Sequence, residues 1–378
     1  MNPSAEFDLI VYGASGYTGR LVAEYLAKTY CADGNLRWAM AGRSAGKLAA
    51  ARDQIGAPAE TPLVVARVED PESLAMLASR TKALITTVGP YAVYGAPVLA
   101  ACVAAGTDYL DLCGEPIWMR QMIEAHDAEA KRSGSRVLFS CGFDSIPFEL
   151  GVYVAQAAAR TRFGRSAPRV NTRVRALQGG ISGGTAATGA ATMAAVQRDP
   201  SLLNILMSPF GLTPGFEGAA QPDGQTPHVD PDVGPVEPFM MAVINTKNVH
   251  RSNLLMAHIY GQDFVYEEMA MAGVGFGDLP PPEARPRPGD GPTPEARESG
   301  FYDLVFIAIA EDGRLRISVK GDRDPGYGST SKMIAETALT LIAATDVPGG
   351  IWTPGAALRD LLVERLQQRA GLSFTFES

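Results

Sequence analysis

The stretch that decides the fold is Leu9-Ile10-Val11-Tyr12-Gly13-Ala14-Ser15-Gly16-Tyr17-Thr18-Gly19-Arg20. An apolar run climbs to the first glycine, small residues follow, and an amphipathic helical pattern then begins. The glycines have the spacing G-x-x-G-x-x-G. The first glycine permits a tight turn, the second lets backbone N–H groups approach a pyrophosphate, and the third lets helix and strand pack closely. This pattern favours a dinucleotide-binding strand–turn–helix unit over an ordinary glycine-rich turn.

A pyrophosphate would lie at the positive end of the helix that follows the turn. The residues predicted to hold it are Gly13, Ser15, Gly16, Tyr17, Thr18 and Gly19.

The second predicted strand, residues 36–41, ends in Gly42-Arg43-Ser44. Folds that bind NAD usually place Asp or Glu here, roughly 20 residues after the glycines, to hold the ribose 2′-hydroxyl. Arg43, with Ser44 and Lys47, instead suits a 2′-phosphate, because a guanidinium can both stack on adenine and pair with phosphate. The sequence therefore predicts NADP as the cofactor. The alternative is that Arg43 only caps a surface turn.

Further strands are predicted at 62–68, 83–88, 108–112 and 136–141, each followed by a helix. This alternation predicts a parallel, doubly wound sheet, whose ligands lie at the carboxyl ends of the strands. Asp70 is predicted either to contact adenine or to cap the next helix. The loop of Val88, Gly89, Pro90 and Tyr91 is expected beside the nicotinamide ribose. Asp144 either caps the helix that begins at Ile146 or faces the substrate.

The second half of the chain lacks the regular alternation of strands and helices predicted for the first half. Strands are predicted at 170–177, 239–245, 263–271, 302–310 and 314–320, the last two joined as a hairpin through Glu311-Asp312-Gly313. Such a mostly antiparallel sheet suits a dimer face or the wall of a substrate cavity. The glycine-rich loop 179–185 either faces a ligand or is a plain turn. Residues 199–238 read as irregular, and the proline-rich residues 278–298 as a mobile loop.

The amino-acid composition bears on the expected partners, the compartment and the presence of metal or disulfide sites. Lys and Arg total 33 against 41 Asp and Glu, a formal charge of −8, which disfavours a nucleic-acid partner. No apolar run reaches the roughly 18 residues of a membrane span, and no signal peptide is evident, so a reducing cytoplasmic setting is expected. The four cysteines and four histidines show no metal-ligand spacing, so no metal and no disulfide framework are expected.

Several motifs together resemble the saccharopine dehydrogenase-like oxidoreductases, and among them most the trans-acting enoyl reductases that serve polyketide-derived lipid synthesis. The matching stretches are VYGASGYTGR (11–20), AGRS (41–44), VGPYAVYG (88–95), DYLDLCGE (108–115), SCGFDSIP (140–147), GGISGGT (179–185) and GYGST (326–330).

The resemblance implies an α/β fold: an N-terminal Rossmann domain with an inserted second α/β domain that contains a mixed, mostly antiparallel sheet. We place the NADP-binding domain at 1–145, the substrate or dimerisation domain at 146–324, and C-terminal helices that return to the Rossmann domain at 325–378. The resemblance also implies NADPH as hydride donor.

Lysine-pathway members bind an amino-acid dicarboxylate, for which a cluster of arginines would be expected. Arg173, Arg175 and Arg251 are scattered along this chain, which favours a less polar, acyl or lipid-like substrate.

Reduction of an enoyl group needs hydride at the β-carbon, a proton at the α-carbon and donors for the enolate oxygen. Tyr91 and Asp144 are the candidate catalytic residues by position. Two rival hypotheses are a saccharopine-type C–N oxidoreductase and a non-catalytic NADP sensor. A homodimer and a partner synthase are the partners considered.

Overall fold

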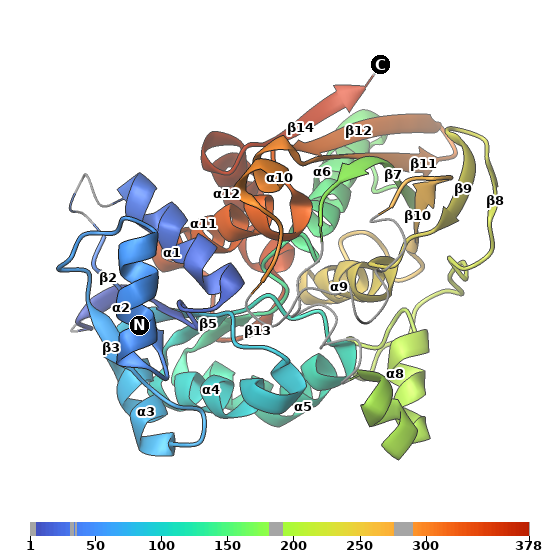
Figure 1. The fold of residues 1–378 in the computed structure, drawn as a ribbon. Helices are drawn as coiled ribbons and strands as arrows, with labels where there is room; N and C mark the ends of the chain where they lie inside the picture. The colour runs from blue at the N-terminus through green and yellow to red at the C-terminus, as the bar shows by residue number, and fades with distance from the viewer. Residues whose placement is uncertain (1–4, 31–33, 35, 181–191, 276–289, 378) are drawn as a thin grey trace.

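The computed structural model describes residues 5–30, 34, 36–180, 192–275 and 290–377. These residues form two seven-stranded sheets, which lie side by side with helices packed on and between them (Figure 1).

The first sheet is entirely parallel, and its strand order is β13-β6-β5-β4-β1-β2-β3. Its strands are β1 (Phe7–Tyr12), β2 (Trp38–Gly42), β3 (Leu63–Val65), β4 (Thr81–Thr86), β5 (Asp108–Leu110), β6 (Arg136–Leu138) and β13 (Gly350–Trp352). The helices that follow the first six strands are α1 (Tyr17–Tyr30), α2 (Ala45–Gln54), α3 (Pro71–Ser79), α4 (Tyr91–Ala105), α5 (Pro116–Ser133) and α6 (Ile146–Phe163). The predicted doubly wound Rossmann sheet is confirmed.

Both faces of this sheet are covered, as a parallel sheet requires. Helices α1 and α2 pack on one face together with α11 (Thr330–Ala343), and α3, α4 and α5 pack on the other (Figure 1). The central strands of this sheet are therefore buried on both sides. Leu9, Ile10 and Val11 of β1, for example, are completely buried.

The second sheet has the order β14-β12-β11-β7-β10-β9-β8 and is mixed, since β10 pairs with β7 in parallel and the other pairs are antiparallel. Its strands are β7 (Arg169–Gln178), β8 (His228–Asp230), β9 (Gly234–Pro238), β10 (Val265–Met271), β11 (Phe301–Ala310), β12 (Gly313–Gly321) and β14 (Leu372–Glu377). Helix α6 packs against β7, β11 and β12. The predicted mixed, mostly antiparallel sheet is confirmed, including its hairpin at Glu311–Gly313.

The C-terminal segment touches both sheets. Helix α11 packs on α1, and β13 adds a strand to the first sheet beside β6. The chain then continues through α12 (Pro354–Arg369), and β14 ends it on the second sheet beside β12. We therefore propose that the segment from 325 onward joins the two domains rather than belonging to one of them.

The strand predicted at 239–245 is wrong. Residues Ala242–Leu255 form the helix α9, which lies between the two sheets (Figure 1). A short apolar run cannot distinguish a strand from a buried helix. The segment is a helix because its polar residues are buried and form hydrogen bonds with neighbours on several sides. These residues include Asn245, Asn248 and Ser252.

Two loops also hold more structure than expected. Within 199–238 lie η1 (Pro200–Leu202), α8 (Leu203–Met207), β8 and β9, and the end of the proline-rich stretch forms α10 (Pro294–Ser299). The 3₁₀ turn and α10 each begin with a proline at the first position after a side-chain cap. Residues 181–185 and 278–289 of the two predicted loops lie outside the described residues. The turn η3 (Pro325–Ser329) precedes α11.

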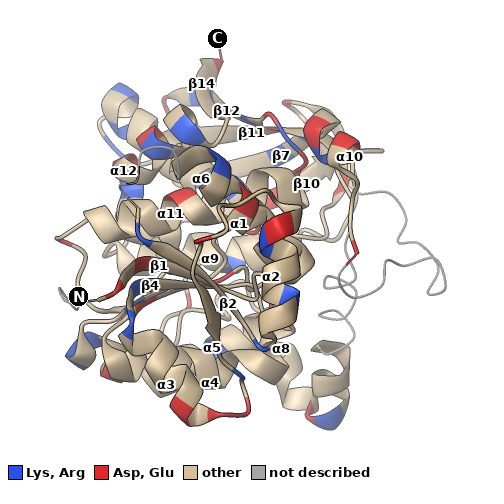
Figure 2. Ribbon diagram, turned by 60° about the vertical axis from the view of Figure 1, so that its left-hand side comes forward, with Lys and Arg blue, Asp and Glu red and all other residues tan. Residues whose placement is uncertain are grey.

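None of the helices in the described residues combines the length and the apolarity needed to cross a bilayer. Acidic and basic side chains are mixed along the helices on the side seen in Figure 2, and they form no single basic face there.

Candidate functional site

The turn after β1 requires glycine at two positions. Gly13 has a φ of +90°, and a Cβ there would lie 2.7 Å from Thr87 Oγ1. A Cβ on Gly19 would lie 2.3 Å from the carbonyl oxygen of Gly13. The turn closes through a hydrogen bond from Gly16 N to Gly13 O of 2.8 Å. The backbone of α1 therefore approaches β1 as closely as the predicted motif requires.

The same turn presents unused donors. Within the described residues, no acceptor takes the N–H groups of Ser15, Tyr17 or Thr18. They stand at the N-terminus of a 14-residue helix, whose dipole favours an anion. This arrangement fits a pyrophosphate, and these are the residues that would hold it.

The end of β2 lies directly beside this turn, since a Cβ on Gly42 would be 3.8 Å from Ser15 Oγ. Arg43 is exposed there, and no carboxylate among the described residues pairs with it. Ser44 caps α2 by accepting a hydrogen bond from Lys47 N at 3.4 Å, which leaves the exposed ammonium of Lys47 one turn away. Two uncompensated cations beside the phosphate turn support the predicted 2′-phosphate site.

Replacement of Arg43 should remove the preference for NADP. We expect Arg43→Ala to weaken NADPH binding by about 10- to 100-fold while leaving NADH binding within about twofold, because only NADPH carries the 2′-phosphate. Calorimetric titration of both nucleotides checks this. The matched control is Arg132→Ala, which removes an exposed arginine from the last turn of α5. A variant that still prefers NADPH by the wild-type ratio would refute the assignment.

Asp70 behaves as a helix cap. Its Oδ1 accepts hydrogen bonds from Glu72 N and Ser73 N at 3.1 and 3.2 Å, at the start of α3. The capping alternative thus has direct structural support, while contact with adenine remains a prediction.

The loop after β4 holds Val88, Gly89 and Pro90 at the start of α4, on the carboxyl edge of the sheet. The Tyr91 side chain follows it but is enclosed. Its hydroxyl donates to Thr86 O and accepts from Leu112 N, both at 3.1 Å. Burial, reinforced by nearby Asp111, holds its pKa well above the ordinary value. Tyr91 therefore ties the ends of β4 and β5 together, and its phenol has no open side for a ligand.

Glu115, to which sequence reasoning gave no role, anchors the same loop. Its two carboxylate oxygens accept from Tyr91 N at 2.7 Å and Ala92 N at 2.9 Å. A carboxylate on the first N–H groups of α4 satisfies donors that the helix itself cannot. Only a pairing across 24 residues brings it there, so no local pattern could have revealed it.

Asp144 lies on the loop between β6 and α6, on the same carboxyl edge. A Cβ on Gly114, in the loop after β5, would lie 3.7 Å from Asp144 Oδ2. No hydrogen bond or ion pair holds this carboxyl in the part of the chain that the structure describes. Burial raises its pKa from 3.8 to about 7. A carboxyl in this state can carry a proton near neutral pH.

Polar groups of the second domain surround this loop. Asn248 on α9 donates to Ser145 Oγ at 2.7 Å, and Asn245 donates to Glu268 Oε1 at 2.8 Å. Burial raises the pKa of Glu268 to about 8, with a smaller contribution from the charge of Asp144. Among the described residues, the amide oxygens of both asparagines are buried with no hydrogen-bond partner. A buried acceptor of this kind can bind a water molecule or a ligand group.

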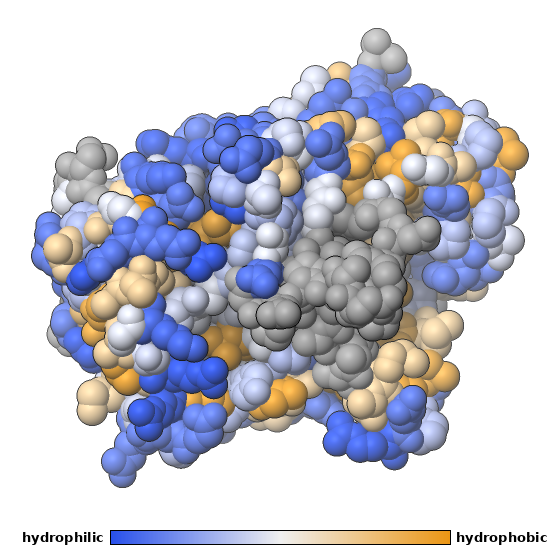
Figure 3. Space-filling model, viewed as in Figure 1, coloured by the Kyte–Doolittle hydropathy of each residue, from blue (hydrophilic) through white to orange (hydrophobic). Residues whose placement is uncertain are grey.

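A pocket of about 370 Å³ opens beside the loops after β4 and β5. One wall comes from the first domain and the other from the segment 192–202; the lining residues are Ala92, Glu115, Ile117, Trp118, Gln121, Thr192, Ala195, Arg198, Asp199 and Leu202. Apolar side chains reach the surface along its surroundings, over α4, α5 and α8 in Figure 3. The pocket has the size and mixed lining of a small-molecule site.

The three arginines considered for an anion clamp are all engaged elsewhere. Arg173 pairs with Asp230 and Glu267, and Arg175 with Asp303 and Glu377. Arg251 donates to Leu212 O and Ile351 O at 2.8 and 2.7 Å. None of them is available to a substrate carboxylate.

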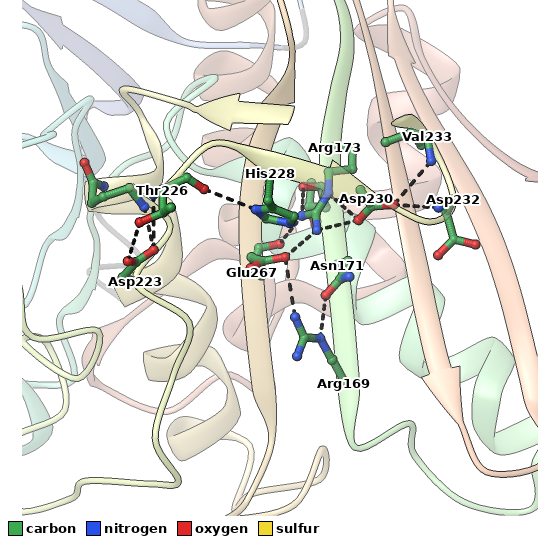
Figure 4. A network of polar contacts seen from close by, with 12 residues as sticks. Arg169, Asn171, Arg173, Asp223, Thr226, His228, Asp230, Asp232, Val233 and Glu267 are labelled. Carbon is green, nitrogen blue, oxygen red and sulfur yellow. Dashed lines mark hydrogen bonds and ion pairs between the residues drawn. The ribbon is translucent and has the colours of Figure 1, made fainter. Parts of the chain in front are cut away.

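One histidine does lie beside carboxylates, which its place in the sequence did not suggest. His228, Asp230 and Glu267 have ligand atoms within 4.8 Å of one another. Figure 4 shows why this cluster is an ion-pair network: the fully buried Arg173 guanidinium lies between the two carboxylates and bonds to both. A metal ion would have to share these oxygens with a fixed positive charge.

The buried thiols offer no reactive group. Cys102, Cys113 and Cys141 are free and buried, and burial raises the pKa of each thiol above its ordinary value. Cys31 lies outside the described residues.

Strand order arranges these features in a line. From Arg43 after β2, the sheet edge runs past the glycine turn after β1, the Val88–Tyr91 loop after β4 and Gly114 after β5 to Asp144 after β6. Four inter-strand spacings separate β2 from β6, about 19 Å. An extended dinucleotide can therefore lie along this edge, with its adenine end near Arg43 and its other end toward Asp144 and the pocket.

Comparisons with known proteins show which family the chain belongs to. Residues 9–138 match the saccharopine dehydrogenase NADP binding domain. A Mycobacterium tuberculosis protein named as a candidate trans-acting enoyl reductase is 37% identical over 97% of both chains. The trans-acting enoyl reductase of Mycobacterium ulcerans is 34% identical over 96% of both.

Among solved structures, the saccharopine dehydrogenase of Saccharomyces cerevisiae superposes with a TM-score of 0.53, at 10% identity, over 98% of this chain and 100% of that one. This likeness shows the shared fold.

Proposed function

The chain belongs to the trans-acting enoyl reductase family, and from that premise we propose that it reduces the carbon–carbon double bond of an enoyl-acyl substrate. It is an NADP-dependent oxidoreductase with a saccharopine dehydrogenase-like NADP-binding domain. The enoyl group and the acyl chain are the parts that we infer.

The observation that carries the proposal is that the described residues form no arginine clamp beside the nicotinamide end of the sheet edge. Arg173, Arg175 and Arg251 are bound within the protein, so a dicarboxylic amino acid would meet no arginine cluster in this part of the chain. The pocket lining combines the apolar side chains of Ile117, Trp118 and Leu202 with polar and charged ones, among them a single arginine, Arg198, beside Asp199. An acyl chain could lie against the apolar part of this lining.

NADPH, held by the glycine turn and Arg43, would when bound provide the hydride that the β-carbon of the substrate needs. The α-carbon then needs a proton, and the donor must be an acid that is protonated near neutral pH. We assign this proton to Asp144, because its carboxyl is half-buried, is unpaired among the described residues, and has its pKa raised by desolvation to about 7. The new C–H bond at the α-carbon forms as the Asp144 O–H bond breaks, which leaves a carboxylate for solvent to reprotonate.

Tyr91 has a positioning role in this scheme. With its hydroxyl bound to two backbone groups, it fixes the spacing of the loops after β4 and β5. The partner synthase and the homodimer stay predictions.

Substrate class can be tested with small thioesters. NADPH oxidation, followed by its fluorescence, should be at least about 100-fold faster with a trans-2-enoyl thioester than with an α-keto acid and an amine. The enzyme without substrate is the blank, and the saturated thioester is the control. Faster turnover of the keto acid and amine would favour the saccharopine-type C–N reaction instead.

A further inference from the structure

Tyr17 links the phosphate turn to the second domain. It is the first residue of α1, directly after Gly16. Its hydroxyl donates to Pro292 O at 2.5 Å, and its ring meets the edge of Tyr327 at a centroid distance of 5.2 Å. A Cβ on Gly291 would lie 2.5 Å from the Tyr17 ring. The segment 291–292 therefore lies directly against the turn that would hold the pyrophosphate.

Arg297 on α10 reaches the same place. Its Nη1 donates to Tyr17 Oη at 3.1 Å and to Pro292 O at 2.8 Å, and its guanidinium lies 5.9 Å from the Tyr17 ring centroid. Both named contacts use one nitrogen, and no contact among the described residues occupies Nε or Nη2. Arg297 can therefore offer three further N–H groups, one on Nε and two on Nη2, while it keeps both of these contacts.

Within the part of the chain that the structure describes, Arg297 forms no direct ion pair, although its charge interacts with the carboxylates of Asp324 and Glu295 at longer range. The nearby Asp324 directs its oxygens to backbone N–H groups, accepting from Gly180 with Oδ1 and from Tyr327 and Gly328 with Oδ2. Arg173 and Arg175, by contrast, each hold two carboxylates.

We propose that Arg297 binds the pyrophosphate of NADPH from the second domain, opposite the N–H groups of α1. The inference rests on the cofactor site described above and adds a ligand that the glycine motif does not contain. A guanidinium suits this role because its fork of donors matches phosphate oxygens. Binding of the cofactor would thereby join α10 to the first domain.

The pyrophosphate is the phosphate within reach. Arg297 is anchored on Tyr17, which begins the helix after β1, whereas the 2′-phosphate belongs at Arg43, one strand further along the sheet edge. The two arginines would thus divide the phosphates of one cofactor between them. This division allows a test with a fragment that carries only the 2′-phosphate.

The test is calorimetric titration with NADPH and with adenosine 2′-monophosphate. Arg297→Ala should weaken NADPH binding by about 10- to 100-fold and change binding of the monophosphate by less than about twofold. Arg297→Lys should recover part of the loss, because it keeps the charge without the fork. Arg323→Ala, which removes a neighbouring exposed arginine, is the control and should bind NADPH as the wild type does.

Tyr17→Phe distinguishes two roles for Arg297, binding the cofactor and merely holding α10 against α1. The variant removes the hydroxyl that Arg297 contacts and leaves the guanidinium in place. We expect at most about a threefold weakening of NADPH binding from it. The proposal is overturned if Arg297→Ala binds NADPH with wild-type affinity, or if Tyr17→Phe weakens NADPH binding as much as Arg297→Ala does. It is also overturned if Arg297→Ala weakens binding of NADPH and of adenosine 2′-monophosphate by the same factor. A wild-type protein that does not bind NADPH would overturn the cofactor site itself, and this inference with it.

Discussion

Gly16→Val is expected to weaken NADPH binding by about 100-fold or more while the protein stays folded. Its branched side chain would stand over the N–H groups of the turn and keep the pyrophosphate from them. Loss of two hydrogen bonds to a charged group costs about 3 to 6 kcal/mol, and each 1.4 kcal/mol is a factor of ten in affinity. Gly16 is exposed, and a Cβ there meets only Gly13 O, at 3.2 Å, so a small adjustment accommodates it.

Calorimetry with NADPH and thermal unfolding together check this result. Ala75→Val, which adds the same side chain at an exposed position of α3, should leave both measurements unchanged. Gly19→Val is a poor substitute, because a Cβ there would collide with Gly13 O at 2.3 Å and disturb folding as well. NADPH affinity within about threefold of the wild type in a folded Gly16→Val protein would mean that the pyrophosphate lies elsewhere.

Asp144→Asn should lower kcat by about 100-fold or more, the usual contribution of a general acid. The amide has nearly the same shape as the carboxyl but no acidic proton to give. NADPH affinity should change by less than about twofold, since no cofactor phosphate is expected at this end of the edge. Steady-state kinetics with an enoyl thioester, together with an NADPH titration, separates the two effects.

The pH profile provides a second readout for Asp144. Burial raises its pKa to about 7, and the protonated form is the active one, so the wild-type kcat should fall as pH rises through about 7. Asp144→Asn should lose this dependence. Asp346→Asn, at an exposed carboxylate, should keep both the rate and the profile. An undiminished kcat in Asp144→Asn would assign the proton to another donor.

Much of the cofactor half could be predicted from the sequence because its signals are local. The glycines after β1 and Arg43 after β2 each lie next to a strand, and in a parallel sheet all strand ends gather on one edge. The structure brings these residues together as that rule requires. The position of Asp144 at this edge could be predicted for the same reason, although the sequence alone does not distinguish a substrate-facing role from a helix-capping one.

The second half could not be predicted to the same depth, since its important contacts join distant residues. Helix α9 reads as a strand because its first turn is apolar, and only its burial between two sheets makes a polar helix there stable. Glu115 meets Tyr91 N, and Arg297 meets Tyr17 across 280 residues. Tyr91 shows the converse limit: its loop lies at the carboxyl edge of the sheet, but its phenol faces backbone groups, and its place beside the nicotinamide ribose stays a prediction.

The placement on which the proposed mechanism depends is that of NADPH along the sheet edge, with its nicotinamide facing Asp144. A crystal structure of the NADPH complex measures this directly, through the distance from the nicotinamide C4 to the Asp144 carboxyl. One substrate double bond must fit between them, so we expect about 5 to 8 Å, given reacting contacts of about 3 to 3.5 Å on each side. A nicotinamide far from Asp144, or a 2′-phosphate away from Arg43, would contradict this placement.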